Sequence, residues 1–404
     1  MNGAQDPISG LVAELEEARA LGILHAQGWR PKRTIIYAAW DGEEPGLLGS
    51  TEWVETHADE LAQHAVAYLN SDTNGRGYFG VEGSHSLEKF IGGVSRDVQD
   101  PETKLTVYKR SQLRTIRNGK AEDRKDARER EDLRIDALGS GSDYSSFLDH
   151  LGVPAMNLGF GGEDIGGIYH SIYDDFYWFT HFSDSTYVYG RALSQAAGIA
   201  VMRLASADIL PFAFSNLAET SGRYVKELKK LRDSLSDQIT ERNRAIGEGV
   251  YFATSDPRDP IFVPARQEAA TQANFDPLDK ASDLLTKAAE RYDSEYSAAL
   301  TRMASAAGNQ ARDANLRSIN QALLQAERAL TSDDGLRGRP WYRHLLYAPG
   351  FYTGYGVKTM PGVREAIEQH EWGNVDPEIV RVAAALTREA TLVNQIAEAL
   401  TSLK

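Results

Sequence analysis

Apolar residues in the first 25 positions recur at helical spacing. From residue 9 to about residue 25, one face of the predicted helix carries Leu11, Val12, Leu15, Ala18 and Leu21. The acidic residues of this stretch lie mostly on the opposite face. The pattern predicts an amphipathic helix whose apolar face packs against the rest of the protein.

Three short runs rich in apolar and β-branched residues predict strands: "RTIIYAAW" (33–40), "AVAYLNSD" (65–72) and "VPAMNLGF" (153–160). Helical stretches lie between them at 46–62 and 86–98. Strands that alternate with helices are typical of an α/β fold with a largely parallel sheet covered on both sides. We therefore expect a three-layer αβα domain over residues 1–206, with "RTIIYAAW" as a strand buried on both faces.

The pattern changes after about residue 206, where amphipathic helices follow one another without strands. Apolar positions step by three or four in three stretches: Tyr224, Leu228, Leu231, Leu235; Leu316, Ile319, Leu323, Ala326, Leu330; and Ile379, Val382, Leu386, Val393, Ile396, Leu400. Asp376 and Pro377 predict the N-cap and first turn of the last helix. We expect a separate all-α domain over residues 207–404. Its apolar faces could form a private core or a subunit interface.

Residues 109–136 are dense in mixed charge and poor in apolar side chains. Such a stretch is typical of a solvated loop or an exposed helix. We expect it to lie on the surface.

The composition of the chain excludes several kinds of binding partner and of metal site. The chain has 404 residues, a net charge of −14 and no cysteine. The acidic balance argues against nucleic acid and anionic membrane surfaces as partners. No stretch approaches the roughly 18 apolar residues of a membrane span. Without thiolates, any bound metal must use His, Asp and Glu.

Acidic residues crowd behind the first predicted strand, where "WDGEEPG" places Asp41, Glu43 and Glu44 close together. Carboxylates this close repel one another unless a positive group lies between them. Taken alone, the Glu pair could equally favour the start of a helix through the macrodipole.

Further metal-ligand types follow other predicted elements. Asp72 ends the second strand, His170 lies beyond the third, and Asp6 precedes the first helix. In parallel α/β sheets the carboxyl ends of the strands share one rim, so these side chains could converge there. Asp72 could instead cap a turn and His170 could be an ordinary surface residue. Oxygen ligands with imidazole suit zinc, manganese or cobalt in a hydrolytic site.

The order of these segments resembles the zinc-dependent peptidase family that includes aminopeptidases, glutamate carboxypeptidase and the transferrin receptor. "WDGEEPGLLGSTEW" is similar to the family signature, and "AQDPISG", "LNSD", "LGSGSDYSSFLDHLGVP" and "YHSIYDD" follow in the family's order. "LPFAFSNLAE" and "RPWYRHLLYAPG" resemble the helical dimerisation domain of the glutamate carboxypeptidase branch. The resemblance implies a dizinc exopeptidase that acts on peptides, forms a homodimer and is exported.

The resemblance also implies roles for individual residues. Asp6 would bridge two zinc ions, with Asp72 on one ion and Glu44 and His170 on the other. Glu43 would be the general base, and Tyr169 would donate to the oxyanion. The remaining implied contacts are to calcium, from Glu52 and Glu55, and to substrate, from Gly141, Ser142, Asp143 and Tyr355.

The chain departs from the family in two respects. The family's first zinc ligand, a histidine ten residues before the bridging aspartate, has no counterpart. The resemblance thus implies the C-terminal part of a longer enzyme, weakly active or inactive alone. The substrate-binding lysine aligns with Gly354, two arginines with Asn157 and Gly159, and an asparagine with Ser142. We therefore expect no preference for acidic substrates.

Two alternatives remain open from the sequence. A non-catalytic, receptor-like homodimer would keep the fold without a metal centre. A serine hydrolase would use Ser140 or Ser142, although "GSGSD" is not a G-x-S-x-G elbow.

Overall fold

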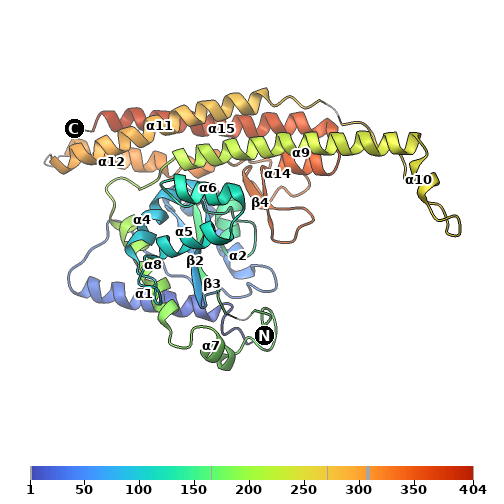
Figure 1. Cartoon of the computed structure of the whole chain (residues 1–404). Helices are drawn as coiled ribbons and strands as arrows, with labels where there is room; N and C mark the ends of the chain where they lie inside the picture. Colours follow the sequence, from blue (N-terminus) through green and yellow to red (C-terminus); the bar gives the residue numbers. More distant parts are fainter. Residues whose placement is uncertain (1, 165, 271, 306–309, 404) are drawn as a thin grey trace.

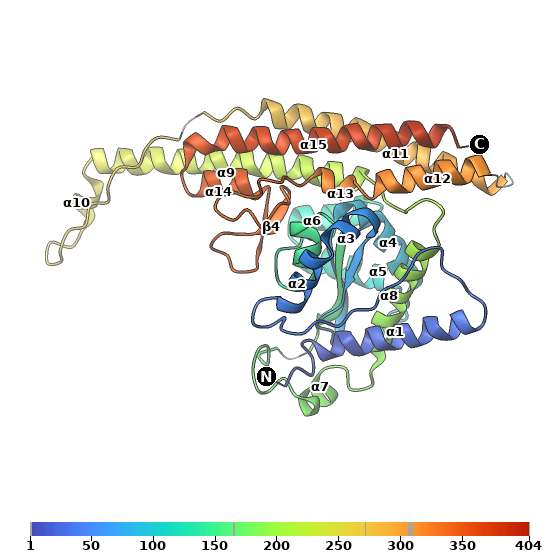
Figure 2. The same cartoon turned by 180° about the vertical axis from the view of Figure 1, so that it is seen from behind.

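The computed structural model describes residues 2–164, 166–270, 272–305 and 310–403. Two parts are evident in Figure 1: a part built around a small sheet (residues 2–206, the sheet part) and a layer of long helices that lies across it (residues 207–403, the helical part). The view from behind in Figure 2 shows the same two layers, with α1 and α7 on the side of the sheet part away from the long helices.

The sheet part contains most of the short elements. In chain order they are α1 (Ile8–Ala26), α2 (Leu48–Thr56), α3 (Ala58–His64), β1 (Tyr68–Asn70), β2 (Gly77–Gly83), the 3-10 turn η1 (His85–Leu87), α4 (Glu88–Asp97), α5 (Val107–Asn118), α6 (Ala121–Glu129), the π-helical turn η2 (Ser146–His150), β3 (Ala155–Gly162), α7 (Phe176–Phe182) and α8 (Val188–Ser206).

The sheet has the order β1-β3-β2. β1 pairs parallel with β3, Tyr68 opposite Ala155, and β2 pairs antiparallel with β3. α5 lies against β2 and α8 against β3. The α/β class is confirmed, but the described sheet is mixed rather than largely parallel, because β2 was missed from the sequence.

The prediction of a buried strand at residues 33–40 is wrong for the described structure. This segment is extended but belongs to no ladder, and Ile36 is 70% exposed. It is attached mostly through side chains: the Trp40 indole donates to the Tyr68 hydroxyl at 3.1 Å, and the Tyr37 hydroxyl donates to Glu17 at 3.0 Å, while the Arg33 N–H donates to the Ala205 carbonyl at 3.1 Å. A strand is buried on both faces only when neighbouring strands and helices cover it.

The inward face predicted for α1 is wrong for Val12 and Leu15 and right for Leu21. Val12 and Leu15 are exposed, whereas Ala13, Glu17 and Leu21 are buried. α1 packs against α8 through small residues, and a Cβ at Gly198 of α8 would touch the Glu17 side chain. Close packing of two helices selects the small-residue face over the more apolar one.

The charge-dense stretch 109–136 forms α5 and α6, and it is only partly surface. The Arg110 guanidinium is buried and forms ion pairs with Asp100 at 2.8 Å and Glu163 at 2.6 Å. Arg130 likewise reaches the buried Glu88 at 2.8 Å. Guanidinium groups can be buried here because each is paired.

The helical part contains α9 (Ser215–Gly247), α10 (Val250–Thr254), α11 (Asp276–Ser305), α12 (Gln310–Leu323), α13 (Ala326–Ala329), α14 (Pro361–Glu368) and α15 (Trp372–Thr401), together with the hairpin β4 (Tyr347–Pro349) and β5 (Val357–Thr359). The predicted class, α/β followed by helical, is confirmed with the addition of this small hairpin. The boundary at residue 206 falls at the end of α8.

The long helices of the helical part pack on one another, since α11 lies along α15 and α9. The predicted stripe of the last helix is buried throughout: Ile379, Val382, Leu386, Val393, Ile396, Leu400. This answers the question that the sequence left open for this helix: the stripe is used inside the chain. The prediction that Asp376 and Pro377 begin the helix is wrong, because α15 starts at Trp372 and Pro377 lies inside it.

The two parts are continuous in their interiors. One cluster of buried apolar residues includes Leu87 and Leu148 of the sheet part and Leu346 and Tyr347 of the helical part. In the described ranges, every helix is too short or too polar to cross a membrane.

Candidate metal centre

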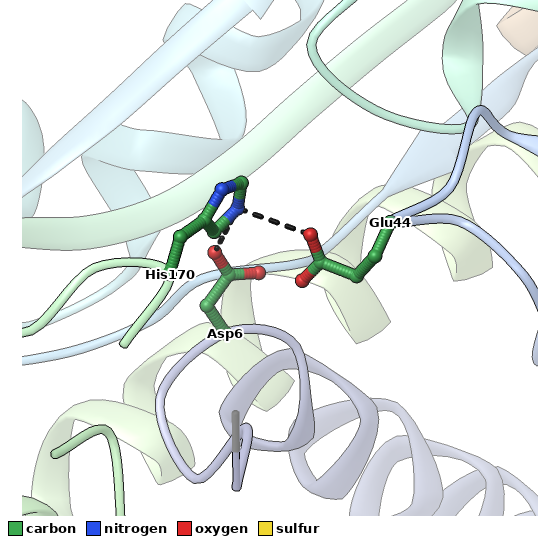
Figure 3. A group of neighbouring side chains, drawn as sticks. All are labelled: Asp6, Glu44 and His170. Atoms are coloured by element: carbon green, nitrogen blue, oxygen red, sulfur yellow. Dashed lines mark ion pairs between the residues drawn. The ribbon is translucent and has the colours of Figure 1, made fainter. Parts of the chain in front are cut away.

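Three metal-ligand side chains meet at one edge of the sheet part. Asp6, Glu44 and His170 each offer a ligand atom, and these atoms lie within 4.8 Å of one another. His170 Nε2 is 3.1 Å from Glu44 Oε2 and 3.5 Å from Asp6 Oδ2. Figure 3 shows the imidazole facing both carboxylates, which come from the start of α1 and from the loop before α2.

Local backbone structure explains how each ligand is presented. The loop of Glu44 is a tight turn in which the Leu47 N–H donates to the Glu43 carbonyl at 2.7 Å, and Gly42 adopts a φ of 64°. His170 has a φ of 55°, a left-handed conformation that is costly for a residue with a side chain. The surrounding structure must therefore hold this loop in place.

Asp72 lies beside the cluster because α1 approaches the end of β1 very closely. A Cβ at Gly10 would be 2.1 Å from the Asp72 carbonyl oxygen, so only glycine fits. The Ser142 hydroxyl donates to Asp72 Oδ2 at 2.7 Å, while Asp72 Oδ1 is buried without a hydrogen-bond partner.

The crowded carboxyls raise one another's pKa. Burial, then Asp72, Glu44 and Glu43, raise the pKa of Asp6 to about 8. Burial, then Asp72, Asp143 and Glu44, raise the pKa of Glu43 to about 7. Among the described residues, the ion-pair partner of Asp6 and Glu44 is His170 alone. Such a site favours a bound cation, which would relieve the repulsion.

The donor set fits zinc. Two carboxylates and one imidazole are hard and borderline donors that zinc accepts, and three protein ligands leave a position for water. The unpartnered buried oxygen of Asp72 is a further carboxylate facing this cluster.

The other sequence-predicted residues surround this cluster. The Tyr169 ring stacks on His170 with centroids 3.7 Å apart, and its hydroxyl is 3.4 Å from that of Tyr355. Tyr355 comes from the helical part, and its carbonyl accepts the Ser140 N–H at 3.1 Å. Burial and Asp72 raise the pKa of Asp143 to about 6. A substrate role for Gly141, Ser142 and Asp143 stays a prediction.

Ser142 is poorly placed as a nucleophile. Its hydroxyl is buried between Asp72 and the Asn70 amide, which donates to it at 3.1 Å, and neither contact involves a histidine. A serine hydrolase would need an adjacent base.

The predicted calcium pair lies on the exposed face of α2. Glu55 accepts the Trp341 indole N–H at 2.6 Å, and in the described ranges neither Glu52 nor Glu55 belongs to a cluster of three ligand groups. A calcium role stays a prediction. Sequence reasoning missed Asp174, whose buried carboxylate contacts the backbone beside Asp6. The only signal was the "DD" that follows His170.

Comparison with protein-family models matches residues 1–181 to peptidase family M28 and residues 273–394 to the transferrin receptor-like dimerisation domain. The chain thus joins a segment that matches the M28 peptidase model to a segment that matches the transferrin receptor-like dimerisation model. The resemblance drawn from the motifs is thus confirmed, and Asp6, Glu44 and His170 all lie within the M28 segment.

Curated relatives of this chain include plant and animal proteins. It is 34% identical over 401 residues to the probable glutamate carboxypeptidase LAMP1 of Arabidopsis thaliana. The aligned region covers 97% of this chain and 49% of the relative. It is 29% identical over 402 residues to the probable glutamate carboxypeptidase VP8 of Zea mays (97% and 48%). It is 26% identical over 416 residues to aminopeptidase NAALADL1 of Mus musculus (98% and 49%). The chain therefore spans about half the length of these relatives.

Proposed function

We propose that this chain binds zinc through Asp6, Glu44 and His170 and acts in the hydrolysis of peptide bonds. The observation that carries the proposal is the convergence of these three side chains, far apart in the sequence, in a carboxylate cluster without a cationic partner other than His170 among the described residues. The M28 match and the names of the relatives support peptides as the substrate class.

The roles of the surrounding residues follow from their charges. A bound zinc ion would supply a Lewis acid and lower the pKa of a water molecule. Glu43, with its pKa raised toward neutrality, would accept a proton from the attacking water at its carboxylate and pass it to the leaving amine. Burial, then Tyr355, raises the pKa of Tyr169, which keeps its hydroxyl protonated for donation to the oxygen that gains negative charge.

The ligand count leads us to propose one tight zinc per chain. Asp6 and Asp72 alone would make a two-carboxylate position, which is a poor zinc site, whereas Asp6, Glu44 and His170 supply three ligands. We therefore expect this chain alone to hydrolyse peptides weakly.

The experiment separates the two adjacent glutamates. Glu44→Gln should weaken zinc binding strongly, as measured by competition with a chromophoric chelator, while Glu43→Gln should keep it and lose peptide hydrolysis. Equal loss of zinc in both variants would contradict the division of roles, and a wild-type chain that binds no zinc would refute the proposal.

We further propose broad specificity rather than a preference for C-terminal glutamate. The hairpin loop beside the site carries Gly354 and the exposed Tyr355, and its Lys358 is paired with Glu368 at 2.8 Å. A panel of peptides tests this: at least tenfold higher kcat/KM on Glu-terminated peptides, about 1.4 kcal/mol, would contradict it.

We also propose a two-fold homodimer through the helical part, on the strength of the transferrin receptor-like match. Since the stripe of α15 is buried inside the chain, the contact must use other side chains. Sedimentation at micromolar concentration should show a dimer, and a monomer alone would refute it.

A further inference from the structure

Asp174 is a fully buried carboxylate that receives two backbone N–H groups from the segment before α1. The Gln5 N–H donates to Oδ1 at 2.7 Å, and the Asp6 N–H donates to Oδ2 at 3.0 Å. Both side-chain oxygens are thus engaged by the backbone that carries one candidate zinc ligand.

The same residue belongs to the loop that carries the second ligand. Asp174 lies four positions after His170, its own N–H donates to the Ser171 carbonyl at 3.4 Å, and its carbonyl accepts the Ala4 N–H at 3.3 Å. A neighbouring link is parallel: the Asn2 amide donates to the Ile172 carbonyl at 2.9 Å. Hydrogen bonds to the side chain and the backbone of Asp174 therefore hold the His170 loop and the Asp6 segment together.

The Asp6 segment has a few further hydrogen bonds, since the Gln5 amide donates to Asp164 at 3.0 Å and the Ile8 N–H donates to the Gly3 carbonyl at 3.1 Å, but neither of these reaches the His170 loop. Residues 2–6 precede α1 and pair in no strand, and His170 holds a left-handed φ of 55°. Buried backbone N–H groups need acceptors, and charge-assisted bonds to a carboxylate are the stronger kind. An aspartate can accept from both N–H groups, whereas an asparagine would turn an N–H donor toward one of them.

We propose that Asp174 is a positioning residue that sets Asp6 and His170 at the separation needed to hold one zinc ion together. Its carboxylate holds the backbone N–H of Asp6, its main-chain N–H bonds the Ser171 carbonyl next to His170, and in the described hydrogen bonds it contacts neither ligand side chain. The inference rests on the proposed zinc site. Partners outside the ligand sphere typically contribute about 10–100-fold to metal affinity.

A matched control exists in Asp184. Its carboxylate is also buried and accepts the N–H groups of Val188, Tyr189 and Gly190 at 2.8–2.9 Å, but it caps α8 and not the ligand segments. Asp174→Asn and Asp184→Asn thus make the same chemical change in the same kind of environment. They differ in which backbone N–H groups lose a carboxylate acceptor: those of the Asp6 segment in the first variant and those at the start of α8 in the second.

The experiment measures zinc affinity by chelator competition, the visible absorption spectrum of the cobalt-loaded chain, and the unfolding midpoint without metal. Asp174→Asn should lose about 10–100-fold in zinc affinity and change the cobalt spectrum. Asp184→Asn should lower the unfolding midpoint and keep wild-type affinity and spectrum. Wild-type affinity and spectrum in Asp174→Asn, or equal affinity losses in both variants, would overturn the inference.

Two further variants complete the design. If Asp174→Asn does not fold, Asp174→Glu keeps both acceptor oxygens but displaces them by one methylene, and unchanged affinity and spectrum there would also overturn the inference. His170→Ala tests the zinc site itself. Loss of affinity in His170→Ala with none in Asp174→Asn refutes only the positioning role, whereas wild-type affinity in His170→Ala refutes the zinc site and the inference with it.

Discussion

The helices α1 and α15 are both amphipathic in sequence, yet they use their apolar residues in opposite ways. Every apolar position predicted for α15 from Ile379 to Leu400 is buried within the chain. In α1 the apolar residues Val12 and Leu15 are exposed, and the buried face carries Ala13 and Glu17. The helical part therefore buries the apolar stripe of α15 inside the chain, whereas the edge of the sheet part that holds the candidate metal cluster presents an apolar surface.

The largest change in the free energy of unfolding should come from a substitution in the buried stripe of α15. Leu386→Ala removes a fully buried side chain from α15 and should lower the free energy of unfolding by about 3 kcal/mol, since the close packing with α11 leaves little room to collapse. Urea denaturation measures it. A loss below 1 kcal/mol would show that this core is looser than the buried stripe implies.

Zinc binding should increase the difference in stability between the two parts, because it should stabilise only the sheet part. At free zinc 100 times Kd, binding to the native state adds about 2.7 kcal/mol. Hydrogen exchange should slow in α1, in the loop of Glu44 and in the loop of His170, and stay unchanged in α11 and α15. Uniform slowing across both parts would mean that the two unfold as one unit.

Low pH should stabilise the folded chain through Glu17, a buried carboxyl group of α1. Burial, then Glu14, raises its pKa to about 7, while the Tyr37 hydroxyl bond opposes this rise. The folded chain therefore keeps a proton that the unfolded chain releases near pH 4.5. Stability from this group is lost as pH rises from about 4.5 to about 7, on the order of 3 kcal/mol.

Glu17→Gln should remove that pH dependence and be more stable than wild type above pH 7. The exposed Glu16→Gln is the control, because its partner Arg19 and its side chain lie at the surface. Thermal unfolding between pH 5 and 8 measures both. A wild-type slope in Glu17→Gln would contradict the assignment.

The smallest effect should come from the exposed face of α1. Val12→Ser replaces a side chain that is 53% exposed and should change the free energy of unfolding by no more than about 0.5 kcal/mol. A loss comparable with that of Leu386→Ala would show that this face is covered in solution. Chemical denaturation of the two variants side by side gives the comparison.

The spacing of apolar residues predicted those elements for which the local sequence alone decides the secondary structure and the buried face. β1, β3 and α4 lie where the sequence placed them, as do the apolar stripes of α9 and α15, whereas α11 was not predicted. Residues 33–40 and the face of α1 were mispredicted because neighbouring elements, and not local pattern, decide whether a strand pairs and which helix face is buried. Pro377 shows the same: its first-turn preference yields to the packing of Trp372 and Val375.

The candidate site was predictable only in part. The resemblance identified Asp6, Glu44 and His170 because the order of ligand types along a chain is preserved in its motifs. Asp174 left no comparable pattern, since its partners are backbone N–H groups that every residue type possesses. Gly10 was missed for a similar reason: its role is to be small where α1 meets the Asp72 carbonyl.

The hairpin that brings Tyr355 to Ser140 has a consequence for how the chain can be divided. One wall of the metal cluster is contributed by the helical part, through the Ser140 N–H to Tyr355 carbonyl bond and the Tyr355 hydroxyl beside Tyr169. The two parts are therefore not interchangeable modules. A chimera spliced after residue 206 would place a foreign hairpin beside the cluster, and its metal affinity would reflect that hairpin as much as residues 1–206.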